Sequence, residues 1–322
     1  MIRRHLLATG LGVALAAPRA GAQPAWPDRP IRLLVGFAPG GTADLIARLL
    51  AQAMQAEFGQ TIVIENRSGA AGMIALQEAA RAAPDGATFA YANVGQIVLT
   101  PLLQPGVADP MKDLVPVAHA VNIPFFVGVS SRVPVRTLAE LVSYARSRPG
   151  ELNYGSSGVG QMTHVAVELL RARTGMDLTH VPYRSGAMAV QEMAAGRIQL
   201  AMEAHSVLRG PEEAGQARIL AVAAPRRSAL APDIPTAAEA GVPDYAVSGW
   251  QGFFAPANVP SAIRTRFAGA VRRALDSGPV RESFARQGFE PGEGASSEFA
   301  AFVDAEARRW GEVIRQASIT AS

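Results

Sequence analysis

The sequence of 322 residues contains no cysteine and only one lysine, Lys112. Without cysteine the chain forms no disulfide, offers no thiolate to a metal and has no lipid-accepting cysteine near its amino terminus. With a single lysine, Schiff-base chemistry and the phosphate-binding lysine of a P-loop are excluded everywhere except at residue 112. Aromatic residues make up 6% of the chain while Ala and Gly are abundant. This composition favours helices packed through small residues over a β-sandwich.

Long apolar runs are also absent, apart from a short one at the amino terminus. Arg3 and Arg4 precede an apolar stretch over residues 6–17, and the small residues at 20–22 follow. This pattern predicts a cleavable export signal over residues 1–22, used by either the general secretory or the twin-arginine route. The stretch is too short for a permanent anchor, so we expect a soluble mature protein in the periplasm.

The charge of the mature chain is balanced. Three of the 30 basic residues lie in the predicted signal, so 27 remain against 27 acidic residues. A balanced chain without a basic stripe lacks the electrostatic footprint of a nucleic-acid-binding protein. We therefore expect no nucleic-acid partner.

Short β-rich runs alternate with helical runs from Ile31 onward, which predicts an α/β protein with mainly parallel sheets flanked by helices. The chain is longer than one hydrophobic core usually organises, so two lobes are expected. Thr137 and Glu140 form a capping-box pattern at one helix start. The predicted strands are Ile31 to Phe37, Ile62 to Glu65, Thr88 to Ala92, Val115 to Ala120, Phe125 to Val129, Leu152 to Tyr154, Leu178 to Val181, Ile198 to Met202 and Ile219 to Ala223.

Three glycine-rich loops, over residues 39–44, 155–160 and 182–187, each join a predicted strand to a predicted helix. In an open α/β sheet such loops lie at the carboxyl ends of the strands, where ligands bind. The free amides and the positive dipole at a helix start favour an anion. Together the loops predict a carboxylate cradle that needs no metal and no buried cation. Its hydroxyl donors are Thr42, Ser156, Ser157 and Ser185.

The motifs expected of enzymes are incomplete. A nucleophile elbow centred on Ser157 fails because Val159 stands where the last glycine should be. His164 and Glu168 could share a helix face and hold a metal, but no third ligand is evident, so we expect no metal and no cofactor. A secreted serine hydrolase that uses His164 as its base stays as an alternative, although no motif supports it.

Several segments resemble one family as a set. FAPGGTADLIARLLA, LNYGSSGVGQMTHVAVELL, THVPYRSGAMAVQEMAAGRIQ and DIPTAAEAGVPDY occur in this order. Together they resemble the Bug or TctC family of periplasmic solute-binding proteins over nearly the whole mature chain. The resemblance implies a two-lobed type II periplasmic binding fold that closes on its ligand like a flytrap. It places residues 23–124 and 249–322 in lobe 1 and residues 125–248 in lobe 2.

The same resemblance implies a receptor rather than an enzyme. It implies capture of a small mono- or dicarboxylate and its delivery to a membrane permease of the tripartite tricarboxylate type. A ligand sensor for a membrane kinase is the alternative within this fold. Such proteins usually act as monomers, which is the oligomeric state we expect.

The resemblance also implies the binding residues of the first loop and of the GSSG loop. Asp44 is the doubtful member, since it would repel a carboxylate unless it caps the helix. Met162 and Met188 are expected near the ligand's far end, which favours apolar or aromatic carboxylates over citrate-like polyanions. An amino acid is a further candidate ligand. Glu203, after a predicted strand, either faces the cleft or solvent. The predicted site is Phe37, Gly41, Thr42, Ala43, Asp44, Ser156, Ser157, Gly160, Gln161, Ser185, Gly186, Ala187 and Glu203.

Overall fold

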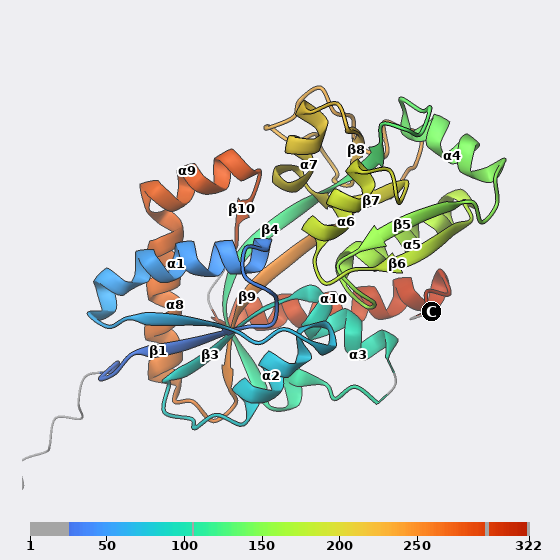
Figure 1. Cartoon of the computed structure of the whole chain (residues 1–322). Coiled ribbons are helices and arrows are strands. Elements are labelled where there is room, and N and C mark those ends of the chain that lie inside the picture. The colour runs from blue at the N-terminus through green and yellow to red at the C-terminus, as the bar shows by residue number, and fades with distance from the viewer. Residues whose placement is uncertain (1–25, 105, 294–295, 321–322) are drawn as a thin grey trace, which may run out of the picture.

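The computed structural model describes residues 26–104, 106–293 and 296–320 (Figure 1). The predicted export signal, residues 1–22, lies outside the described residues. Within them, the strands join into one continuous sheet with the order β2-β1-β3-β9-β4-β7-β5-β6, and β8 and β10 also pair with β4. Its strands are β1 Ile31–Val35, β2 Ile62–Asn66, β3 Thr88–Asn93, β4 Leu114–Ser130, β5 Leu152–Ser156, β6 Leu178–Pro182, β7 Leu200–Ala204, β8 Ala217–Val222, β9 Ser248–Pro256 and β10 Glu290–Pro291.

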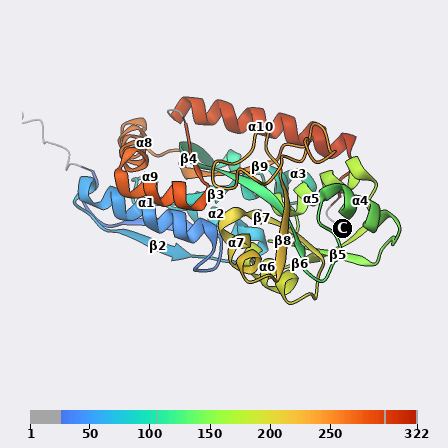
Figure 2. The same ribbon diagram turned by 90° about the horizontal axis from the view of Figure 1, so that it is seen from above.

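Helices cover both faces of this sheet (Figures 1 and 2). The α-helix α1 shows why they form where they do. Its buried Ile46, Leu50, Met54 and Phe58 recur every four residues, so they share one face of the helix. The helix ends at Gly59, which takes the left-handed conformation with a φ of 63°. The helices are α1 Thr42–Phe58, α2 Met73–Ala80, α3 Thr100–Leu103, α4 Leu138–Arg146, α5 Met162–Thr174, α6 Gly186–Ala194, α7 His205–Glu213, α8 Ser261–Asp276, α9 Gly278–Gln287 and α10 Ser296–Gln316.

The sheet has two halves of the same design. In the first half, β2, β1 and β3 are parallel, and β9 runs antiparallel to β3. In the second half, β6, β5 and β7 are parallel, and β4 runs antiparallel to β7. Each half is thus mainly parallel and covered by helices, which places the starts of α1, α5 and α6 at the carboxyl ends of β1, β5 and β6.

One long strand, β4, belongs to both halves. It pairs with β9 from Leu114 to Pro124 and with β7 from Phe125 onward. The prediction of two separate strands here was wrong. Asn122 and Pro124 weaken a local strand pattern, but hydrogen bonding to neighbours in both halves keeps the backbone extended across them. The change of partners after Pro124 coincides with the lobe boundary expected at residue 124.

The strand β9 was missed because glycine at 249 and 252 interrupts its apolar run. Gly252 is required by packing rather than by conformation. A Cβ at this position would lie 2.4 Å from the Phe299 ring and 2.7 Å from the Ala118 carbonyl oxygen. The sheet and α10 therefore approach each other through the space that this glycine leaves open.

The other strand predictions are confirmed to within two residues at most boundaries. The shift that matters is in β7, which is Leu200–Ala204 instead of Ile198 to Met202. Glu203 therefore lies within the strand and not after it. The predicted capping box is confirmed at Thr137, whose hydroxyl accepts the Glu140 amide at 3.1 Å.

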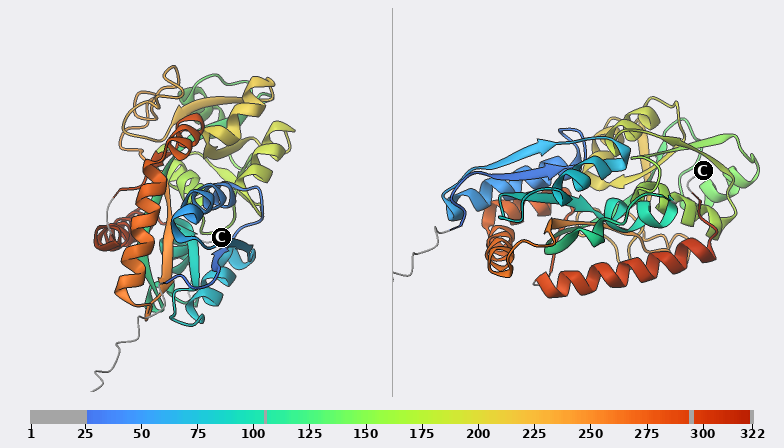
Figure 3. Two further views of the ribbon diagram at one scale, coloured as in Figure 1. Left: turned by 90° about the vertical axis from the view of Figure 1, so that its left-hand side faces the viewer. Right: turned by 90° about the horizontal axis from the view of Figure 1, so that it is seen from below.

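The carboxyl-terminal helix α10 lies on the side of the sheet away from α1, α6 and α7 (Figures 2 and 3). Its buried Glu306 accepts hydrogen bonds from Trp250 Nε1 on β9 at 3.2 Å and from Trp310 Nε1 at 3.0 Å. One carboxylate oxygen thus accepts from two buried indole donors. One of these hydrogen bonds joins α10 to β9. Among the described residues, no helix is long and apolar enough to cross a bilayer.

We expect Glu306→Ala to lower the free energy of unfolding by about 2–4 kcal/mol, because it leaves two buried indole N–H groups without an acceptor. Urea unfolding followed by tryptophan fluorescence measures the change. Glu312→Ala is the matched control, since Glu312 is exposed on the same helix and accepts a hydrogen bond from the exposed Gln316. The control should change stability by less than about 0.5 kcal/mol. Equal effects of the two substitutions would contradict this role for Glu306.

Candidate ligand-binding site

A cavity of about 340 Å³ opens between the two halves, at the carboxyl ends of the parallel strands. Segments from every part of the chain meet there, because each half of the sheet directs its strand-to-helix loops toward the other. The lining residues are Phe37, Ala38, Gly40, Gly41, Thr42, Ala43 and Leu45 from the first loop and α1; Asn93, Ile123 and Phe125 from β3 and β4; Ser157, Gln161, Met162 and Thr163 from the second loop; Ser185, Gly186 and Ala187 from the third; and Glu203, Ser206, Val207, Gln251 and Gln287.

The first wall of the cavity is the start of α1. Its N-cap, Gly41, has no side chain to accept a hydrogen bond, so the amides of the first turn stay free. Thr42 adds a hydroxyl beside them. The positive end of the helix dipole and these free donors make this wall suited to an anion.

Asp44 does not line the cavity. It is buried, and its carboxylate accepts from the Gly40 amide at 3.0 Å, Arg48 Nε at 2.9 Å and Asn66 Nδ2 at 2.9 Å. Burial alone would raise its pKa, but these hydrogen bonds outweigh burial and lower the pKa of Asp44 below its ordinary value. Asp44 therefore fixes the shape of the first loop from behind.

The second wall is the start of α5. The loop before it bends through Gly158 and Gly160, with φ values of 123° and 77°, which only glycine adopts without strain. The Ser157 amide donates to Thr163 Oγ1 at 2.9 Å, and the two hydroxyls lie 2.8 Å apart. When Thr163 donates to Ser157 Oγ, the Ser157 hydroxyl is left to donate into the cavity. The amides of Met162 and Thr163 begin the helix and have no acceptor within it.

The third wall is the start of α6. The Ser185 hydroxyl caps this helix by accepting the Met188 amide at 3.3 Å. Gly186 and Ala187 supply the free amides of the first turn, and both line the cavity. Three helix starts therefore converge on one space. No arginine, lysine or histidine is among the described residues that line it, so neutral donors provide its anion-binding character.

Ten of the thirteen predicted site residues line the cavity: Phe37, Gly41, Thr42, Ala43, Ser157, Gln161, Ser185, Gly186, Ala187 and Glu203. Asp44, Ser156 and Gly160 do not. Gly160 instead packs against the lobe opposite its own, where a Cβ would lie 3.0 Å from Thr100 Oγ1. Met162 lines the cavity as predicted, whereas Met188 is exposed outside the lining.

Ser156 faces away from the cavity, into a buried polar cluster. Its Oγ lies 2.6 Å from His180 Nε2 and accepts the Gly158 amide at 3.1 Å. The His180 ring stacks on Tyr154 and lies 4.3 Å from the ring of His164. Consecutive residues at the end of a strand point to opposite faces, which is why Ser157 reaches the cavity and Ser156 does not.

The same cluster removes the geometric basis of the hydrolase alternative. His164 Nδ1 accepts one long hydrogen bond, from the Gly160 amide at 3.4 Å, and its Nε2 has no hydrogen-bond partner among the described residues. The histidine that reaches a serine is His180, and that serine is shielded from the cavity. Glu168 is bonded to Tyr154 and Arg171. Within the described ranges, no group of three or more His, Asp or Glu side chains is placed to hold a metal ion.

Sequence reasoning missed the lining residues that lie outside glycine-rich loops. Asn93 ends β3, a parallel strand of the first half, so the rule that ligands bind at the carboxyl ends of strands could have found it. Gln251 comes from β9, the strand that was missed, and Gln287 ends α9 far along the chain. Ile123 and Phe125 flank the point where β4 passes between the halves. For these residues no local pattern signals proximity to a ligand.

Gln161 joins the two halves across the cavity. From the start of α5, its buried side-chain amide donates to the Ala71 carbonyl at 3.1 Å and accepts from Asn93 Nδ2 at 3.2 Å. Ala71 lies in a segment that holds Ala70 and Ala71 in the left-handed conformation, with φ values of 46° and 54°. Both hydrogen-bonding atoms of Gln161 are therefore used to hold the second loop against the first half.

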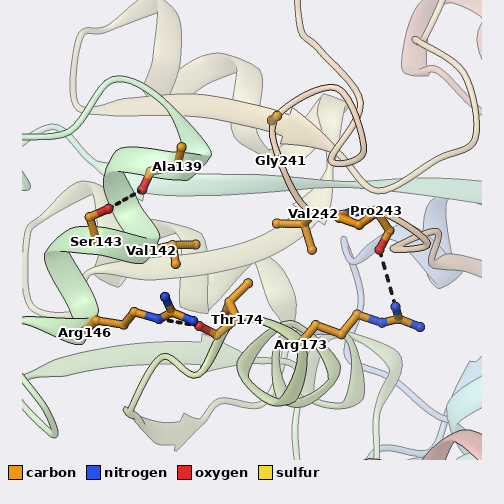
Figure 4. A pocket seen from close by; sticks show the side chains of 10 residues that line it. Ala139, Val142, Ser143, Arg146, Arg173, Thr174, Gly241, Val242 and Pro243 are labelled. Atoms are coloured by element: carbon orange, nitrogen blue, oxygen red, sulfur yellow. Dashed lines mark hydrogen bonds between the residues drawn. The ribbon is translucent and has the colours of Figure 1, made fainter.

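A second cavity, of about 390 Å³, is larger but poorly suited to an anion (Figure 4). It lies between α4, the carboxyl end of α5 and the segment around Pro243. Its two arginines are already engaged, Arg146 with the Thr174 carbonyl at 2.6 Å and Arg173 with the Pro243 carbonyl at 3.3 Å. The carboxyl end of a helix carries the negative end of the dipole, which disfavours an anion there.

The chain is similar to known proteins along most of its length. A family model described as the tripartite tricarboxylate transporter family receptor matches residues 46–319. The "UPF0065 protein in tcbD-tcbE intergenic region" of Pseudomonas sp. (strain P51) is 33% identical over 322 residues, covering 99% of this chain and 96% of that protein.

Two solved structures are similar along nearly their whole length. The first is R. palustris Rpa4515 with adipate, 36% identical, with a TM-score of 0.88, covering 92% of this chain and 99% of that one. The second is MatC (Rpa3494) from Rhodopseudomonas palustris with bound malate, 32% identical, with a TM-score of 0.85, covering 90% and 100%. The predicted two-lobed periplasmic binding fold is confirmed.

We expect Gln161→Ala to weaken carboxylate binding about 5- to 30-fold, because the loss of two hydrogen bonds between the halves makes the closed, binding-competent form rarer. Calorimetry measures the affinity, and small-angle X-ray scattering of the ligand-free protein should show a larger radius of gyration. Gln104→Ala is the control. It removes one weaker bond across the same gap, to the Val159 carbonyl at 3.4 Å, from outside the cavity. Unchanged scattering and affinity in Gln161→Ala would contradict this role.

Acid should destabilise the protein partly through His164. Burial lowers the pKa of His164 to about 4, below the value near 6.5 expected in the unfolded chain. The stabilising contribution is full above pH 6.5, and it is lost as the pH falls toward 4, because the unfolded chain takes up a proton that the folded one excludes. Urea unfolding at pH 7 and pH 4.5 should show about 2–3 kcal/mol less acid destabilisation in His164→Phe than in the wild type. Parallel losses in both proteins would contradict this account.

Proposed function

The chain belongs to the tripartite tricarboxylate transporter receptor family, and from this premise we propose that it captures a small carboxylate in the periplasm and delivers it to a membrane permease of the tripartite tricarboxylate type. The members of this family and the matched structures are substrate-binding proteins, so the chain is a receptor and not an enzyme. The single observation that carries the proposal is the convergence of three helix starts on one cavity whose described lining contains no basic side chain.

A carboxylate fits the donors that this cavity presents. Free amides at the starts of α1 and α5, with the hydroxyls of Thr42 and Ser157, can surround one carboxylate group from two sides. The chemistry of the relatives supports the same class, since the two similar structures hold adipate and malate. The apolar part of the lining, which includes Phe37, Ile123 and Phe125, suits the carbon skeleton of such a ligand.

Neutral donors suit a receptor that must also release its ligand. A buried guanidinium would hold a carboxylate tightly but would be left unpaired, at a high free-energy cost, whenever the cavity is empty. Amides at helix starts carry no full charge and are hydrated in the open form, so an empty cavity has no such free-energy cost. Because the donors come from both halves, binding favours closure, and the closed form is what a permease would recognise.

Export follows from the amino-terminal segment. We propose that residues 1–22 are removed on passage to the periplasm by the general secretory or the twin-arginine route. The relatives support this location, since they include a structure described as a periplasmic transporter. We also propose that the lobes divide at residue 124, where β4 passes between the two halves of the sheet, and at residue 248, where β9 begins.

Ligand-induced stabilisation tests the proposed function. Thermal unfolding is measured with aliphatic, aromatic and amino-acid carboxylates, each beside the amide in which the carboxylate is replaced by a carboxamide. A ligand at about 100 times its dissociation constant stabilises the folded state by about 2.7 kcal/mol, which raises the melting temperature by several degrees. We expect a shift with one class of carboxylate and none with its amide. Equal shifts with the amides, or no shift with any carboxylate, would overturn the proposal.

Thr42→Val and Ser157→Ala should each lower the affinity for the best carboxylate about tenfold, since each removes a hydroxyl that donates to a charged group. Ser156→Ala removes no direct ligand contact, because the Ser156 hydroxyl faces His180. Ser143→Ala is the control, as this hydroxyl donates to the Ala139 carbonyl on α4, outside the cavity. Calorimetry that shows wild-type affinity in both cavity variants would remove these hydroxyls from the site.

A further inference from the structure

The cavity contains one ionisable lining side chain among its described residues, and it is an acid. Glu203, from the end of β7, lines the same space as the three helix starts. No arginine, lysine or histidine in that lining is available to neutralise it. A carboxyl group of the protein therefore faces a cavity whose other features favour a carboxylate of the ligand.

The Glu203 carboxyl is buried and only half satisfied. The residue is 8% exposed, and its Oε2 accepts the Ala204 amide at 3.0 Å. No described residue donates a hydrogen bond to Oε1. Burial raises the pKa of Glu203 to about 7, partly opposed by the Ala204 amide, and no charged neighbour contributes to the shift. An acceptor that lines the cavity without a donor from the described protein residues is available to a donor that the ligand brings.

The unpaired oxygen lies against the start of α6. A Cβ added to Gly186 would be 1.5 Å from Glu203 Oε1, so no other residue fits at 186 while the carboxyl stays in place. A second carboxylate of a ligand would be stabilised most at a helix start, because the positive end of the helix dipole lies there. Here the protein's own carboxyl takes that position, and the starts of α1 and α5 remain for one ligand carboxylate.

Among the described residues of the neighbouring elements, no cation contributes to the pKa of Glu203. On α7, His205 is the adjacent titratable residue, and burial lowers its pKa, so it is neutral at and above pH 7. The acids of the neighbouring helices already have partners. Glu192 on α6 pairs with Arg197, Glu213 on α7 pairs with Arg209, and Glu212 accepts the Ile219 amide. Ser206 and Gln287, which also line the cavity, are neutral.

Resting on the proposed function, we propose that Glu203 determines specificity by accepting a hydrogen bond from the far end of the ligand. The cavity then selects a monocarboxylate whose other end carries a donor, an ammonium group being the strongest, over a dicarboxylate of the same length. One end of the ligand is held by neutral amides and hydroxyls, and the other is held by Glu203, the one ionisable side chain among the described lining residues.

Three matched series of unbranched compounds, each from four to seven carbons, test this selection. They are the ω-amino carboxylates, the simple monocarboxylates and the dicarboxylates, titrated by calorimetry into the purified protein at pH 8.5. We expect the wild type to bind the best amino carboxylate at least about tenfold more tightly than the dicarboxylate of equal length, as a charge-assisted hydrogen bond allows. In Glu203→Gln the preference should fall below about threefold. Glu192→Gln, an acid on α6 outside the cavity, should keep the wild-type preference.

The pH dependence gives a second readout that a merely structural role would not produce. Between pH 8.5 and 6.5 the ammonium and carboxylate groups of the ligands stay largely charged, whereas Glu203 takes up a proton near pH 7. As the pH falls, dicarboxylates should bind the wild type more tightly and amino carboxylates less tightly. Both slopes should vanish in Glu203→Gln. The pH dependence of the two wild-type affinities tests the role of Glu203 even if that variant does not fold.

The outcomes separate this inference from the proposed function. A wild type that prefers dicarboxylates at pH 8.5, or a preference that survives in Glu203→Gln, overturns the role of Glu203 and leaves carboxylate capture standing. Slopes of the same sign for both ligand classes overturn it as well. If no compound of the three series binds and the wider carboxylate panel causes no stabilisation, the inference falls together with the proposed function.

Discussion

The pairing of β4 with β9 is the interaction on which the rest of this structure depends. The two strands are bonded to each other from Leu114 to Pro124, and β4 then continues as a member of the second half. This shared strand fixes how the two halves face each other. Because each half is mainly parallel, its helix starts gather at one edge, and the shared strand brings those edges to the same cavity. A shift of that pairing by one residue would reverse which side chains face the core and would separate the three starts.

The site relies on backbone geometry more than on charged side chains. Free amides at helix starts bind an anion without burying a fixed cation, so the empty receptor bears little cost. The side chains behind the loops hold this geometry in place. Asp44 ties the first loop to Asn66, and the Ser156 and His180 pair supports the second from within the core. Gln161 then links the second loop to the first half. Glu203 is the exception, since it brings a single negative charge into a neutral cavity.

Much of the fold could be predicted from local patterns. The apolar run before residue 38 and the four-residue spacing after it define a strand and a helix, and the glycine-rich segment between them defines a loop. The same reasoning found the second and third loops, so ten of the predicted residues do line the cavity. It failed where tertiary pairing overrides local preference. The break expected near Pro124 does not occur, and β9 forms despite two glycines, because neighbouring strands satisfy their backbones. Gln251 was not predicted as a site residue, because it lies on β9.

The sequence by itself determined where the helices start and which of them lack a side-chain cap, because these depend on residues within a few positions of one another. Only the tertiary structure decided which side chains reach the ligand. Ser156 and Ser157 are chemically identical side chains, yet Ser156 contacts His180 and Ser157 lines the cavity. Glu203 is one acid among 27 until Gly186, 17 residues earlier in the chain, packs against it and no cation does. Such selection depends on segments far apart in the chain, and local patterns carry no information about their meeting.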